Sequence, residues 1–256
     1  MHVDLLFDPF GGRWTDVRAG ALAAEEAGFD GVWLYDHLAG SAHGASHVLE
    51  CWTTLTAIAA TVPRIALGSL VLNVANRDAG TLAVMAATLQ EVSGGRLLLG
   101  LGAGGGRDTP YWTEQEALGR PVGDSAARRR AVEEAVARLR AIWSGTVGGV
   151  SGFLRPQPPP PIIIGGFGPK MAELAGRVGD GMNAPGGPQL IHLIETAREA
   201  YARSGRDPDD FLMTASGGPS SPERKRLAEA GVRRIIIYVR PPYVGGVHRI
   251  RDALAT

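Results

Sequence analysis

Cysteine is nearly absent from this sequence, since Cys51 is the only one among 256 residues. A single thiol excludes an internal disulfide and a metal site built from several thiolates, and it is compatible with a reducing compartment. Charge of one sign is not in excess either, because 26 Lys and Arg residues balance 26 Asp and Glu residues. The chain therefore offers no overall field that would attract nucleic acid or an anionic membrane, and any anion must be bound locally.

Long hydrophobic runs are also missing. No apolar stretch reaches the ~18 residues that a membrane-spanning helix needs. The N-terminal stretch MHVDLLFDPF has no basic segment followed by an apolar one. We therefore expect no signal peptide and a soluble, cytoplasmic protein. Hydrophobic residues still make up 45% of the chain, which is typical of a globular protein with a full core.

The sequence does contain a regular alternation of short apolar runs and amphipathic stretches. The apolar runs predict strands at 2–7, 31–37, 64–73, 96–102, 162–166, 181–185, 211–216 and 233–239. The stretches between and after them predict helices at 16–29, 48–62, 80–95, 125–143, 169–179, 189–205, 222–231 and 246–255. The best-defined strands are continuously apolar, as expected for parallel strands that are buried on both faces.

Eight strand–helix units in a chain of this length favour the α/β class and a (β/α)₈ TIM barrel. A doubly wound sheet would show the same local pattern, but the composition does not change at any candidate domain boundary. The proline tract from Pro156 to Pro161 is interpreted as a stiff loop, because too few residues flank it to make two α/β domains. We therefore expect residues 1–256 to form a single barrel domain.

A glycine-rich stretch, RLLLGLGAGGG, matches the G-x-G-x-x-G pattern of dinucleotide-binding turns at Gly100, Gly102 and Gly105. That fingerprint normally lies between a strand and the helix that follows at once, with an acidic residue about 20 positions further on at a strand end. Here the glycines begin inside the expected strand, and about 18 residues of loop follow. Asp124, near the required offset, falls at a helix start. In a barrel the same glycines lie where the strand-to-helix loops build active sites.

A second glycine cluster lies in IIIGGFGPKM, where Gly166 and Gly168 precede a helix that opens at Pro169. Proline at the first helical position leaves free N–H groups and the positive end of the helix facing the rim of the barrel. Lys170 adds a positive charge. The cluster predicts a phosphate site, and a plain tight turn is the alternative.

Four motifs in order carry a family resemblance: GFDGVWLYDH, IALGSLVLNVANRDAGTLA, SGGRLLLGLGAGG and PIIIGGFGPKMAELAGRVGDGM. Together they resemble the bacterial luciferase-like oxidoreductases, especially the branch that uses the 5-deazaflavin coenzyme F420. The match covers the chain to about Asn183 and is weaker beyond. It implies a (β/α)₈ barrel, in agreement with the count of units, and an enzyme that transfers a hydride between F420 and an organic substrate. Homodimers are common in the family.

The resemblance also implies roles for single residues. His37 matches the histidine that faces the reactive ring carbon in many deazaflavin members, so it is the expected catalytic residue. The expected cofactor-binding residues fall in four groups: a bulge with a cis Leu70–Val71 peptide under the middle ring (Ser69, Leu70, Val71), a polar residue at the pyrimidine edge (Asn73), backbone beside the tail (Gly102, Ala103, Gly104), and the phosphate-binding turn with its neighbours (Gly166, Phe167, Gly168, Pro169, Lys170).

The sequence departs from one branch of the family at two positions. A sugar-phosphate dehydrogenase of this family has a glutamate where Gly105 stands and a tryptophan where Ser41 stands, and their absence argues against that activity. Two other functions stay open beside the F420-dependent one. They are an FMN-dependent luciferase-like monooxygenase and a non-catalytic flavin-binding barrel.

Several other polar residues are not expected to take part in catalysis or cofactor binding. His43 and His47 have a spacing compatible with a metal, but no acidic or cysteine partner lies nearby at a suitable spacing, so no metal site is expected. Asp36 is interpreted as structural, because neighbours along a strand alternate between its faces. The run from Arg128 to Arg130 is interpreted as a solvated helix face.

Overall fold

Parallel strand segments form one closed sheet in the computed structural model of the protein, which describes residues 1–255. The segments are β1 (His2–Phe7), β2 (Gly31–Leu34), β3 (Ala66–Ser69), β4 (Leu72–Asn73), β5 (Leu97–Gly102), β6 (Ile162–Gly165), β7 (Gly181–Pro185), β8 (Leu212–Ser216) and β9 (Arg234–Val239). Each pairs with its neighbours in parallel, β9 pairs with β1, and both β3 and β4 pair with β5. Since β3 and β4 are two parts of one interrupted strand, the closed sheet is an eight-stranded barrel.

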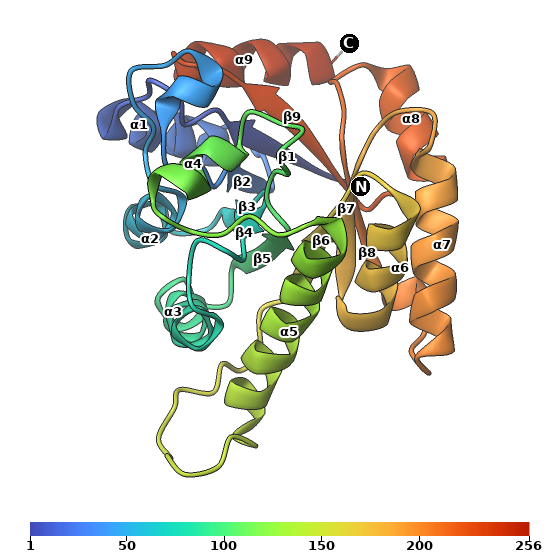
Figure 1. Ribbon diagram of the computed structural model, residues 1–256. Coiled ribbons are helices and arrows are strands. Elements are labelled where there is room, and N and C mark those ends of the chain that lie inside the picture. The colour runs from blue at the N-terminus through green and yellow to red at the C-terminus, as the bar shows by residue number, and fades with distance from the viewer. Residues whose placement is uncertain (256) are drawn as a thin grey trace.

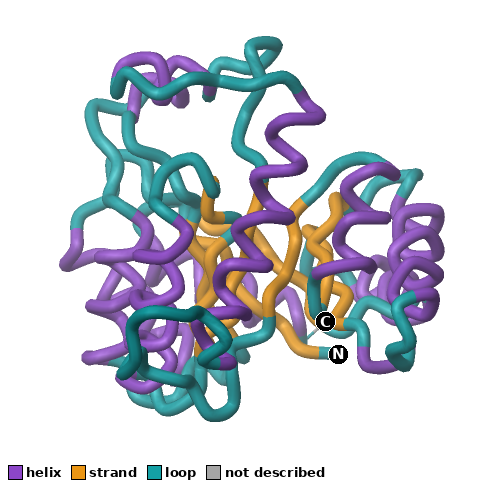
Figure 2. The backbone as a smooth tube through the Cα atoms, turned by 60° about the horizontal axis from the view of Figure 1, so that its bottom comes forward, coloured by secondary structure: helices purple, strands orange, loops and turns teal. Residues whose placement is uncertain are grey.

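Helices surround this barrel (Figures 1 and 2). They are α1 (Trp14–Glu26), α2 (Cys51–Thr61), α3 (Ala79–Val92), α4 (Trp112–Ala117), α5 (Ser125–Ser144), α6 (Pro169–Val178), α7 (Leu190–Arg203), α8 (Ser221–Glu229) and α9 (Tyr243–Leu254). Short 3₁₀ helices cover Gly40–His43 and Pro208–Asp210. The alternation of strand and helix confirms the predicted (β/α)₈ barrel. No helix within residues 1–255 is both long and apolar enough to cross a membrane.

The inside of the barrel is packed with side chains. Leu6, Trp33, Leu70, Ile163 and Ile236 form a buried cluster of their own, separate from the larger core between the strands and the helices. Such a filled interior is usual for this architecture, and it leaves only the ends of the barrel for a ligand.

The end of the barrel near the start of the strands is closed by polar contacts. The buried Asp4 accepts hydrogen bonds of 2.7 Å from Trp33 Nε1 and from the Nε and Nη2 atoms of Arg234. Burial raises the pKa of the Asp4 carboxyl, and the hydrogen bonds and charge of Arg234 oppose that rise. These contacts close this end of the barrel, so a ligand-binding site is expected at the opposite end.

One helix was not predicted from the sequence. α4 lies inside the loop between β5 and α5, and it has only six residues. A helix this short shows no full apolar period, so a periodicity reading takes it for loop. By contrast, α5 begins where expected, because Asp124 Oδ1 accepts a hydrogen bond of 2.7 Å from Ala127 N and caps the helix.

Candidate active site

A cavity of about 560 Å³ opens at the carboxyl ends of the strands. Its walls come from the segments that follow β2, β3, β5 and β6, and from Asn73 on β4, Asn183 on β7 and Tyr238 on β9. This is the end of a barrel where strand-to-helix loops carry active sites. The volume is in the range of sites that hold small ligands and cofactors.

One side of the cavity is built from glycine backbone. Gly102 to Gly106 after β5 and Gly165 to Gly168 around the end of β6 line it, with few side chains between. Gly104 has a φ of +66°, and a Cβ there would lie 2.5–2.7 Å from the amide group of Asn73. Glycine is therefore required at this position, and it keeps the backbone exposed to the cavity.

The second glycine turn leads into α6. Gly168 is the N-cap residue, Pro169 is the first helical residue, and no side chain of the described residues caps the helix. A Cβ on Gly168 would meet no atom within 4 Å. The turn thus presents an uncapped helix N-terminus beside open space, which is an arrangement that suits an anionic group.

The floor of the cavity contains a cis peptide bond between Leu70 and Val71, as predicted. Both residues line the cavity, and they separate β3 from β4. The Val71 side chain lies against glycines of the neighbouring strands, since a Cβ on Gly165 would be 2.7 Å from Val71 Cγ1. Ser69 points elsewhere: its hydroxyl donates to Gly100 O at 2.8 Å and accepts from Gly100 N at 3.0 Å.

Another part of the cavity is lined by the rings of Tyr35, His37, His43 and Tyr111. The ring centroids of Phe10 and His43 are 4.0 Å apart, and those of His37 and Tyr111 are 4.9 Å apart. Burial lowers the pKa of His43, and the neighbouring His37 adds to this effect. Burial also raises the pKa of Tyr35 to about 12. His43 and Tyr35 are therefore uncharged near neutral pH.

His37 is held by a carboxylate from α4. Its Nδ1 atom lies 3.1 Å from Glu114 Oε1, and the two side chains are 17% and 4% exposed. Glu114 also accepts hydrogen bonds from the backbone N–H groups of Leu38, at 3.2 Å, and of Ala39, at 3.4 Å. No pattern in the sequence indicates this pair, because 77 positions separate its members and the six residues of α4 are too few to show a helical period.

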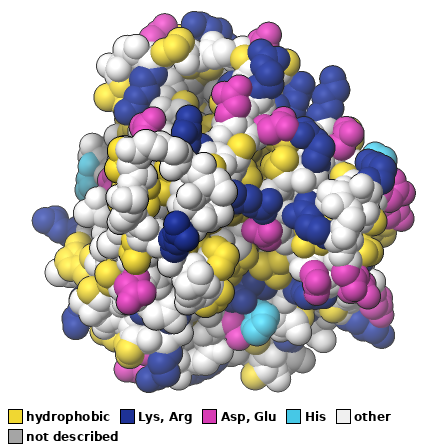
Figure 3. Space-filling view, turned by 90° about the horizontal axis from the view of Figure 1, so that it is seen from below, with side chains coloured by type: hydrophobic (Ala, Val, Ile, Leu, Met, Phe, Trp, Pro, Cys, Tyr) yellow, Lys and Arg dark blue, Asp and Glu magenta, His cyan; other side chains and the backbone are white. Residues whose placement is uncertain are grey.

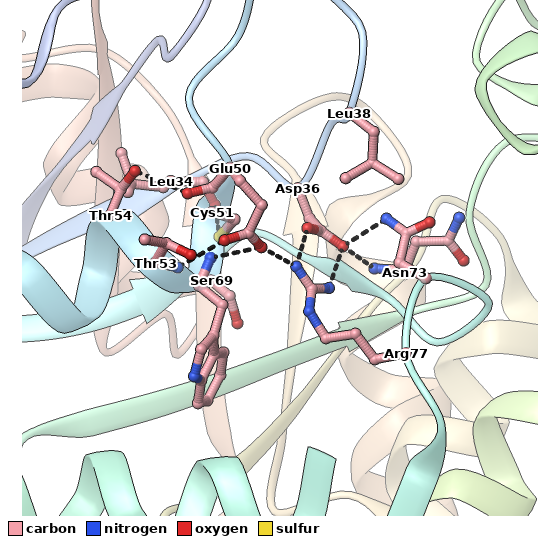
Figure 4. Close-up of polar contacts among 12 residues, drawn as sticks. Leu34, Asp36, Leu38, Glu50, Cys51, Thr53, Thr54, Ser69, Asn73 and Arg77 are labelled. Atoms are coloured by element: carbon pink, nitrogen blue, oxygen red, sulfur yellow. Dashed lines mark hydrogen bonds and ion pairs between the residues drawn. The ribbon is translucent and has the colours of Figure 1, made fainter. Parts of the chain in front are cut away.

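A buried ionic network fixes the segment that carries His37 (Figure 4). Arg77 donates to both oxygens of Asp36, at 2.8 and 2.9 Å, and it also pairs with Glu50. Asn73 N donates to Asp36 Oδ2 at 2.9 Å. Burial alone would lower the pKa of the Arg77 guanidinium, but the two carboxylates raise it. Asp36 thus ties the end of β2 to β4 and α2, and it also lines the cavity.

Arg128 corrects a prediction. It was interpreted as part of a solvated helix face, but it lines the cavity, and its Nη1 atom donates to Gly104 O at 2.6 Å. Its Nε atom is buried and has no hydrogen-bond partner within residues 1–255. Runs of charged residues are usually solvated. Here the path of the preceding loop determines whether Arg128 faces solvent or the cavity, and periodicity does not predict that path. Arg130 is exposed, as expected.

The structure brings most of the predicted site residues to one cavity. The residues that line it are His37, Leu70, Val71, Asn73, Gly102, Ala103, Gly104, Gly166, Phe167 and Gly168. Ser69, Pro169 and Lys170 are not among the lining residues, and Lys170 is exposed. Within the described part of the chain, no group of three or more His, Cys, Asp or Glu side chains is placed to hold a metal ion.

Comparisons with known proteins agree on one family. The model of the luciferase-like monooxygenases matches residues 6–255. An F420-dependent glucose-6-phosphate dehydrogenase of Beutenbergia cavernae is 33% identical over 84% of this chain and 67% of that protein. A 5,10-methylenetetrahydromethanopterin reductase of Methanolobus tindarius is 27% identical over 86% of this chain and 65% of that protein. The chain spans between 59% and 67% of the length of the first three dehydrogenases that it matches.

Solved structures show the same architecture. An F420-dependent secondary alcohol dehydrogenase in complex with an F420-acetone adduct superposes with a TM-score of 0.84 at 18% identity. The superposition covers 99% of this chain and 98% of that one. At this level of identity the similarity establishes the barrel fold.

Proposed function

Because the chain belongs to the luciferase-like monooxygenase family, we propose that it is an oxidoreductase that transfers a hydride between coenzyme F420 and an organic substrate. The observation that carries the proposal is the lining of the cavity. It combines exposed glycine backbone with a histidine that is held by a buried carboxylate.

The glycine side fits a planar cofactor with an anionic tail. Gly102 to Gly104 and Gly166 to Gly168 would hold the tail against bare backbone, and Leu70 and Val71 would lie beneath the ring. The buried Nε–H of Arg128 has no partner within residues 1–255, and an anionic group would satisfy it. F420, when bound, supplies the site that accepts or delivers a hydride; the protein supplies binding and orientation.

His37 supplies the proton movement that accompanies hydride transfer. When an alcohol is oxidised, its carbon loses a hydride to the cofactor and its hydroxyl group loses a proton. A neutral imidazole accepts such a proton, and an imidazolium returns it in the reverse direction. Since Nδ1 is turned to Glu114, Nε2 is the ring nitrogen left for the substrate.

The charges in the cavity favour a substrate without a phosphate group. Among the lining residues of the described chain, only Arg128 is a lysine or arginine, and it lies on the glycine side. The part lined by aromatic rings offers the uncharged His43 and Tyr35 and the carboxylate of Glu114. A sugar phosphate would meet no compensating cation there. Gly105, which replaces the glutamate of a sugar-phosphate dehydrogenase, supports the same conclusion.

Substrate oxidation by the F420-loaded protein tests this proposal. The protein is offered 2-propanol, cyclohexanol and glucose 6-phosphate in separate reactions, and loss of the visible absorption of oxidised F420 is followed. We expect an alcohol to be oxidised and glucose 6-phosphate to be inert. Faster turnover of glucose 6-phosphate than of either alcohol would contradict the substrate class.

The location and assembly of the protein belong to the same proposal. We expect a cytoplasmic homodimer without a nucleic-acid or membrane partner. Cell fractionation and light scattering after gel filtration measure these two properties directly.

A further inference from the structure

The Glu114 carboxylate faces N–H donors from a segment far away in the sequence. Oε1 lies 3.1 Å from His37 Nδ1 and 3.4 Å from Ala39 N, and Oε2 lies 3.2 Å from Leu38 N. The side chain is 4% exposed, so water does not compete with these partners. A carboxylate only accepts hydrogen bonds, and therefore the imidazole must donate from Nδ1.

We propose that Glu114 is a positioning residue that keeps the proton of neutral His37 on Nδ1 and leaves the Nε2 lone pair for the cavity. One consequence of this proposal rests on the proposed function: Nε2 is then ready to take a proton from a substrate hydroxyl group. The identity of the tautomer is a property of the protein alone.

Gln115, the residue after Glu114, also holds α4 in place. Gln115 Nε2 donates to Asn76 Oδ1 at 2.5 Å, and Asn76 Nδ2 donates to Asp36 Oδ2 at 2.9 Å. Asp36 directly precedes His37 in the chain. The short helix α4 is thus attached at two adjacent residues to the segment that carries the histidine, and the carboxylate has little freedom to move away from Nδ1.

The substitution Glu114→Gln should reverse the tautomer of His37. A carboxamide has one accepting oxygen and one donating NH₂ group. If the oxygen took the place of Oε1, the NH₂ group would face the N–H of Leu38, and two donors would meet. If the oxygen takes the place of Oε2, it keeps the shorter hydrogen bond from Leu38 N, and the NH₂ group faces Nδ1 and the more distant N–H of Ala39, at 3.4 Å; this is the less costly orientation. The imidazole then accepts at Nδ1 and carries its proton on Nε2.

Nitrogen NMR of the ligand-free protein at mildly alkaline pH tests the proposal, with His37→Asn used to assign the signals. We expect wild-type His37 to show a protonated Nδ1 and an unprotonated Nε2, and Glu114→Gln to show the reverse. Glu116→Gln is the matched control, because Glu116 is an exposed residue of the same helix; it should leave the wild-type pattern unchanged.

Two results would overturn the proposal: a wild-type protein with the proton on Nε2, or a folded Glu114→Gln protein that keeps it on Nδ1. The wild-type spectrum alone shows which nitrogen of His37 carries the proton, even if the variant does not fold. In F420-loaded protein, Glu114→Gln should slow alcohol oxidation at least tenfold, since the wrong tautomer cannot take the proton. A protein that fails to bind F420 would refute the proposed function and leave the tautomer result standing.

Discussion

At the scale of single residues, the proposed function gives different tasks to different parts of the cavity lining. In that proposal His37 moves the proton, Glu114 positions His37, and the glycines bind the cofactor. Because the tasks lie on different elements, a substitution in one part should impair one property and spare the other. This separation makes the account testable with two variants.

The first variant is His37→Ala. General acid–base assistance is worth about 10²–10⁴-fold in rate, so kcat should fall by about that range. The affinity for F420 should change by less than about tenfold, because the glycine wall is untouched. Steady-state kinetics and a melting curve on the same preparation measure the two effects. Full activity of a folded variant would remove His37 from the reaction.

The second variant is Gly168→Val. The new side chain would stand in open space at the cavity wall, since a Cβ there meets no atom within 4 Å. The melting temperature should therefore fall only by the small amount expected when valine replaces glycine at a helix N-cap, while the affinity for F420 drops at least tenfold. Gly148→Val is the matched control, because a Cβ on this loop glycine also meets nothing within 4 Å and it does not line the cavity. Equal affinities in both variants would show that the turn before α6 does not hold the cofactor.

At the scale of elements, the network around Arg77 joins the ends of β2 and β4 to the start of α2. Glu50 caps α2 by accepting hydrogen bonds from Trp52 N at 3.0 Å and Thr53 N at 2.6 Å. Burial alone would raise the pKa of Glu50, but these hydrogen bonds and the charge of Arg77 lower it below its usual value. The charged form of Glu50 therefore stabilises the folded protein.

Stability should depend on pH through this residue. Since its pKa is lower in the folded than in the unfolded chain, the contribution is present above the unfolded value of 4.5 and is lost as pH falls through the folded value. At neutral pH, Glu50→Gln should reduce the free energy of unfolding by about 1 kcal/mol, as loss of a helix cap does. Urea denaturation at neutral and acidic pH measures the difference, which should shrink in acid. Glu26→Gln, at an exposed position, is the control; a pH-independent loss at Glu50 would contradict the account.

The elements that the sequence predicted are those marked by an apolar run or by an amphipathic period. The strands 2–7 and 181–185 were predicted with the bounds that the structure has. α4 was missed because six residues show no periodicity, and with it Glu114 was missed. Arg128 was misread because its direction depends on how the loop before α5 folds back. Patterns along the chain reveal packing against the sheet, whereas contacts between distant loops follow from the closed fold alone.

At the scale of the whole molecule, the barrel is closed at one end and open at the other. Asp4, Trp33 and Arg234 hold the closed end, and glycines and aromatic rings line the open one. On the face shown in Figure 3, positive and negative side chains are interspersed, in keeping with the balance of charges in the sequence. That face offers no single-sign field for nucleic acid.

If this cavity is a site for F420, the wild-type protein should prefer F420 to FMN, and fluorescence titration with each of the two measures that preference. We expect F420 to bind at least tenfold more tightly, which corresponds to about 1.4 kcal/mol. FMN bound tenfold more tightly than F420 would contradict the claim and favour a monooxygenase of the same family.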